Sequence, residues 1–75
     1  MTAQKLIELA ARRFGADPSQ LKPADDMFAS LGIDSFQAAD LMSEVEIEFD
    51  VEIPDYELQG IKTFQALAEK IDARR

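Results

Sequence analysis

The amino-acid sequence predicts an all-α fold: a four-helix bundle made of three main helices and a short third helix, with a long first loop. Three stretches carry apolar residues at helical spacing, and each is bounded by residues that begin or end helices. No stretch alternates apolar and polar residues for long enough to predict a strand. Because 75 residues leave no room for a second hydrophobic core, we expect residues 1–75 to form a single domain.

The first main helix is predicted over residues 2–14. Thr2 is placed to cap its start. At the other end, Arg12 and Arg13 suit the negative pole of the helix dipole, and Gly15 is a typical stop. The apolar residues lie on one face: Ala3, Leu6, Leu9, Ala10 and Phe14.

Residues 16–34 form the long first loop. It contains two prolines and five scattered apolar residues, so we expect it to pack against the core, with short helical turns near residues 18–21. The apolar residues are Leu21, Met27, Phe28, Leu31 and Ile33.

The second main helix is predicted from Ser35 to Phe49. Asp34 is a good N-cap, and Gln37 completes a capping box. Its apolar stripe consists of Ala38, Leu41, Met42, Val45 and Phe49. The helix is expected to end near Asp50, because the segment before Pro54 favours extended backbone.

Two further elements follow. A short helical turn fits residues 55–60, and a last helix begins after Thr63, its expected N-cap. The core-facing residues of the last helix are Phe64, Leu67, Ala68 and Ile71, and the basic pair Arg74 and Arg75 suits its C-terminal end.

The distribution of charge restricts the class of partner. The net charge is −7, and the span from residue 23 to 61 holds eleven acids and no Lys or Arg. Nucleic acid needs a basic patch, so it is not an expected partner, whereas a basic protein surface is. A role in solubility alone is the alternative. With no membrane-spanning run and no signal-peptide pattern at the N-terminus, we expect a cytoplasmic protein without a membrane span.

Ser35 is the residue with the clearest chemical meaning. The chain contains no His and no Cys, so Ser35 cannot act as the nucleophile of a hydrolase triad. A helix start offers free backbone N–H groups that tolerate a phosphodiester, and the preceding loop keeps the hydroxyl accessible. Ser35 is therefore expected to be a site that another enzyme modifies, and a plain helix-start serine is the alternative.

The opposite face of the second main helix has the pattern of a docking surface. A rotation of 100° per residue brings Phe36, Asp40, Ser43 and Ile47 together, away from the apolar stripe. Glu44 and Glu46 add to an acidic rim around two large apolar groups. Isolated exposed apolar residues are also common, which leaves chance as the alternative. The acid clusters match no calcium-binding loop, so no metal site is predicted.

Over nearly its whole length the chain resembles the acyl carrier proteins. Their signature is Asp-Ser-Leu at the start of the second helix, acids along that helix, Phe-Asp near its end and Ile-Pro beyond. The corresponding residues here are Asp34-Ser35-Phe36, then Asp40, Glu44, Glu46 and Glu48, then Phe49-Asp50 and Ile53-Pro54.

The resemblance implies a carrier and not an enzyme. It implies that Ser35 carries 4′-phosphopantetheine, transferred from coenzyme A by a phosphopantetheinyl transferase, and that acyl groups are held on this arm as thioesters. Enzymes that transfer, condense or modify acyl groups are the implied partners, and the carrier is expected to be a monomer. The implied acyl pocket is lined by Ala38, Leu41, Val45, Ile53 and Ile61.

Three departures from the pattern of fatty-acid carriers concern the docking face. Phe36 replaces the usual Leu, Gln37 stands at a commonly acidic position, and Ile47 replaces a further acid. We therefore expect a specialised carrier, in a fatty-acid, polyketide or related pathway, whose partner has an apolar socket. The alternatives are a peptidyl or D-alanyl carrier, and a carrier-like interaction module that is not modified.

Overall fold

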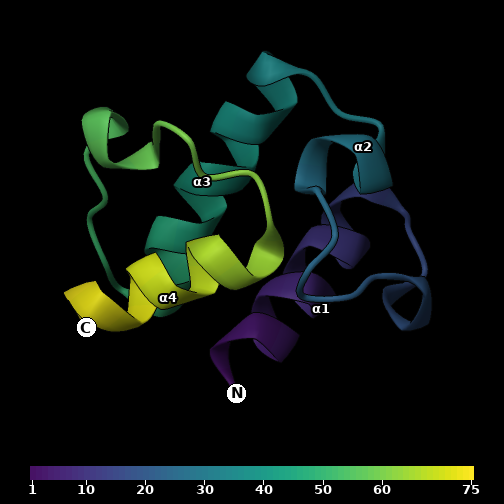
Figure 1. Cartoon of the computed structure of the whole chain (residues 1–75), viewed down its shortest axis with the longest axis horizontal. Coiled ribbons are helices and arrows are strands. Elements are labelled where there is room, and N and C mark those ends of the chain that lie inside the picture. Colours follow the sequence, from purple (N-terminus) through teal and green to yellow (C-terminus); the bar gives the residue numbers. More distant parts are fainter.

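The computed structural model describes residues 1–75 and contains only α-helices and 3₁₀ turns as regular elements, which confirms the predicted all-α class. Figure 1 shows α4 crossing α3, with α1 beside them and both chain termini at the same edge of the molecule. The first turns of α3 lie at the opposite edge. The elements are α1 (Thr2–Phe14), η1 (Pro18–Gln20), α2 (Met27–Leu31), α3 (Ser35–Phe49), η2 (Asp55–Leu58) and α4 (Phe64–Arg74).

The hydrophobic core lies mainly between α1 and α4, which form the most extensive helix contact. All sixteen buried residues are apolar, so no buried polar side chain needs a partner in this core. The largest fully buried side chains are Phe64, Leu6, Ile7, Leu67, Ile71 and Val45. The face of α3 that points into this core supplies Leu41, Val45 and Phe49, in agreement with the predicted stripe.

The two ends of α3 form as the sequence predicts. Asp34 Oδ1 accepts a hydrogen bond from the Gln37 N–H at 2.9 Å, and Gln37 Oε1 accepts one from the Asp34 N–H at 3.1 Å. This reciprocal pair is the predicted capping box. At the other end, Asp50 adopts the left-handed conformation with φ 54°, and the chain leaves the helix there.

One expectation about local structure, that for the long first loop, is corrected. The long first loop contains the α-helix α2. This helix has only five residues, which is too short for its hydrophobic periodicity to be recognised in the sequence. Asp26 caps α2 by accepting hydrogen bonds from the N–H groups of Phe28 and Ala29, and Gly32 ends it at φ 66°. The short helical turn predicted over residues 55–60 is confirmed and is the 3₁₀ helix η2.

Thr2 does not cap α1. It is the first helical residue, and its hydroxyl donates to the carboxylate of Asp72 on α4, so it joins the two ends of the chain. Thr63 does cap α4, because its Oγ1 accepts the Ala66 N–H at 3.1 Å.

Candidate functional site

Ser35 is exposed and is the first residue of α3, directly after the Asp34 cap. The capping box uses the N–H groups of Asp34 and Gln37, whereas those of Ser35 and Phe36 make no hydrogen bond. Free N–H groups and the positive end of the helix dipole together favour a negatively charged group at this position. The local geometry therefore suits a phosphodiester on the Ser35 hydroxyl.

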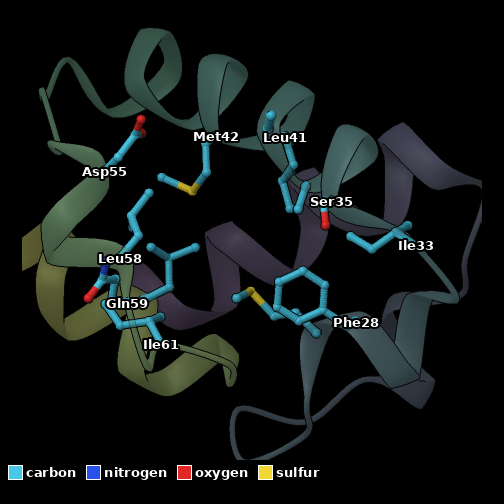
Figure 2. A pocket seen from close by; sticks show the side chains of 13 residues that line it. Phe28, Ile33, Ser35, Leu41, Met42, Asp55, Leu58, Gln59 and Ile61 are labelled. Atoms are coloured by element: carbon cyan, nitrogen blue, oxygen red, sulfur yellow. The ribbon is translucent and has the colours of Figure 1, made fainter.

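A cavity of about 340 Å³ opens beside Ser35 and is lined by residues of α2, α3, the η2 region and α4. Figure 2 shows Ser35 at one end with Phe28 and Ile33, while Leu58 and Ile61 face them from the η2 side. Ten of the thirteen lining residues are hydrophobic. A cavity of this size and composition is at the small end of the range, about 300–1,000 Å³, that binds small molecules.

The cavity lining overlaps the acyl pocket expected from the sequence only in part. Ala38, Leu41 and Ile61 line it. Val45 and Ile53 do not line it; both belong to the buried core cluster, and Val45 has no exposed surface. Sequence reasoning missed several lining residues that come from the first loop, the α3 stripe and η2: Met27, Phe28, Ile33, Met42 and Leu58. The scattered apolar residues of the first loop were the available signal.

Two large apolar side chains of the expected docking face are open to solvent. Phe36 is 86% exposed and Ile47 is 81% exposed. They are eleven residues apart, so they lie on the same side of α3, about 16 Å from each other along the helix axis. Both large apolar side chains of the expected docking face are therefore accessible from solvent.

The five polar residues of the same expected face all have partners within the chain. Gln37 belongs to the capping box, and Ser43 Oγ donates to the Ala39 carbonyl at 3.3 Å. The Arg13 guanidinium lies 4.0 Å from Asp40 Oδ2 and 3.6 Å from Glu44 Oε1. Glu46 Oε2 accepts the Ile53 N–H at 3.0 Å. Only the two apolar members of the face therefore lack an internal interaction.

Other kinds of site find no support in the structure. No group of three or more acidic, His or Cys side chains is arranged to hold a metal ion. None of the helices has both the length and the apolar character needed to cross a bilayer.

Comparison with known proteins identifies the class to which this helical fold and serine site belong. Residues 4–71 match the family described as phosphopantetheine attachment site. The chain is 34% identical over 68 residues to the acyl carrier protein of Chlorobium phaeobacteroides, covering 91% of this chain and 87% of the relative. It is 31% identical over 70 residues to the acyl carrier protein of Bdellovibrio bacteriovorus, covering 93% of this chain and 90% of the relative.

The chain belongs to the acyl carrier protein family. Its function is that of a carrier protein and not of an enzyme, and its cofactor is phosphopantetheine. The resemblance noted from the sequence is thereby confirmed at the level of the family.

Proposed function

We propose that Ser35 is the attachment residue for 4′-phosphopantetheine and that the loaded chain presents acyl groups to enzymes of a fatty-acid, polyketide or related specialised pathway. One observation carries the proposal: of the four serines, Ser35 alone lines the apolar cavity. Its exposure and the two free N–H groups at the helix start fit the phosphodiester of the cofactor.

The attachment reaction assigns a simple role to the chain. The Ser35 oxygen forms a bond to the phosphorus of coenzyme A, adenosine 3′,5′-bisphosphate leaves, and the hydroxyl proton passes to the transferase. When bound, the cofactor supplies the terminal thiol that holds acyl groups as thioesters. The chain has no cysteine of its own, and it contributes the serine, the helix start and the neighbouring cavity.

The mostly hydrophobic lining of the cavity supports acyl cargo over a peptidyl or D-alanyl group, because a charged amino group loses hydration against it. We further propose that α3 is the docking face for the phosphopantetheinyl transferase and for enzymes that transfer, condense or modify the acyl group. The exposed Phe36 and Ile47 support this assignment. The same proposal describes a cytoplasmic monomer that binds partners one at a time.

Intact mass after incubation with coenzyme A and a promiscuous phosphopantetheinyl transferase tests the attachment site. We expect one phosphopantetheinyl group on the wild-type chain and none on Ser35→Ala. Ser30→Ala is the matched control, because Ser30 is also exposed and lies on neighbouring α2, and it should be loaded normally. If the wild type stays unmodified while a control carrier is loaded, the proposal is wrong and an interaction module without an arm is the better description.

A further inference from the structure

Arg13 reaches from the last turn of α1 to the docking face of α3. Its guanidinium lies within ion-pair distance of two carboxylates, those of Asp40 and Glu44. These acids are four residues apart and so occupy successive turns of the same helix face. Because Arg13 belongs to another helix, the pairing depends on how α1 packs against α3.

The pairing changes the charge that a partner meets near Ser35. Asp40 and Glu44 are two of the three acids in the expected rim, and Glu46, the third, is engaged by the Ile53 N–H. Glu48, which is exposed and has no ion pair, lies about 20 Å along the helix axis from Ser35. The part of the face next to the attachment serine therefore offers apolar surface and few carboxylates that are free to bind a cation.

We propose that Arg13 is a specificity-determining residue, which occupies the carboxylates that a basic partner surface needs and thereby favours partners with apolar sockets for Phe36 and Ile47. This inference rests on the proposed docking role of α3. A partner Lys or Arg has to compete with the Arg13 guanidinium for Asp40 and Glu44. A partner that encloses Phe36 has no such competitor.

The expected size of the effect follows from the exposure of the groups. The Arg13 side chain is 38% exposed, and those of Asp40 and Glu44 are 69% and 39% exposed. Exposed ion pairs are weak and are screened by salt. Removal of Arg13 should therefore strengthen the binding of a basic partner about twofold to fivefold at low salt.

Direct binding tests the inference without requiring the loading reaction. Carriers with Ser35→Ala are titrated into a phosphopantetheinyl transferase that has a basic docking surface, at about 25 mM and about 300 mM NaCl. The test variant is Arg13→Gln and the matched control is Arg12→Gln, since Arg12 is exposed, adjacent and without an ion pair. Both variants change the net charge equally, so their difference reports the local pairing and not long-range attraction.

We expect Arg13→Gln to lower Kd more than Arg12→Gln at low salt, and the difference to vanish at high salt. Arg13→Lys should restore the wild-type Kd, and Asp40→Asn with Glu44→Gln should abolish the effect of Arg13→Gln. Thermal unfolding checks that the variants remain folded. Equal Kd values for Arg13→Gln and Arg12→Gln overturn the inference. The assignment of Ser35 as the attachment residue would be unaffected, because the intact-mass experiment tests it separately. If none of these variants binds the transferase while a control carrier does, the proposed docking role of α3 is wrong.

Discussion

Where α1 crosses α4, apolar side chains are almost completely removed from solvent, whereas around the first turns of α3 large apolar groups stay accessible. Leu6, Phe64 and Ile71 have no exposed surface, but Phe36 is 86% exposed. The cavity also lies on the α3 side, lined mainly by residues of α2, α3 and the η2 region. Burial is what stabilises a small domain, so the α1–α4 side holds the fold together and the α3 side is free to bind. Variants on the two sides should therefore have separable effects.

The largest expected effect is the loss of stability in Phe64→Ala on the α1–α4 side. Phe64 is fully buried, so its truncation removes contacts and leaves a void, at a cost of about 3–5 kcal/mol. Phe28→Ala is the matched control, because Phe28 lies beside the cavity and is 37% exposed. Urea unfolding measures both free energies. Equal losses for the two variants would show that the α3 side contributes to the core as much as the α1–α4 side does.

A smaller effect is expected where the two sides are joined. The Glu57 carboxylate on η2 forms ion pairs with Lys70, at 3.4 Å, and with Arg74, both on α4. These ion pairs hold η2, whose residues line the cavity, against α4. Because the basic partners are about one-third exposed, Glu57→Gln should lower the free energy of unfolding by about 1 kcal/mol or less.

The control for this prediction is Glu48→Gln, which removes the same charge from an exposed position with no ion pair. Unfolding in low and high salt distinguishes the variants, because only the Glu57→Gln effect should shrink as salt screens the pairs. A loss of stability in Glu48→Gln equal to that in Glu57→Gln would mean that net charge, and not the attachment of η2, determines the effect.

The sequence was sufficient to predict those features that depend on residues close together in the chain. The capping box of α3 follows from Asp34 and Gln37, and the Thr63 cap of α4 follows from one side chain at a helix start. The placement of Ser35 at the helix start follows from the same local pattern. By contrast, α2 was missed because five residues carry too little periodicity, and Thr2 was misassigned because its partner, Asp72, is distant in sequence.

What the sequence could not supply is the angle between helices. The stripe of α3 is correct, but whether a stripe residue faces the cavity or the core depends on how α1 and α4 cover it. Met42 therefore lines the cavity, while Val45, three residues later, is buried in the core. The pairing of Arg13 with Asp40 and Glu44 has the same origin, because it requires α1 and α3 to lie side by side.

The smallest expected effect concerns η1, the 3₁₀ turn whose start is stabilised by two hydrogen bonds to Asp17. Asp17 Oδ1 accepts from the Ser19 hydroxyl at 2.8 Å and from the Ser19 N–H at 2.9 Å. These two bonds, of which the one from the hydroxyl has the larger effect, hold the pKa of Asp17 below its ordinary value of 3.8.

Because the pKa of Asp17 is lower in the folded state, the stabilisation is present above about pH 4 and is lost as pH falls through the folded-state pKa. Asp17→Asn should therefore lose less stability than the wild type when unfolding is compared at about pH 5 and below pH 3. Ser19→Ala should raise the pKa of Asp17 toward 3.8 in an NMR titration, and an unchanged pKa in that variant would show that Ser19 is not the cause of the shift.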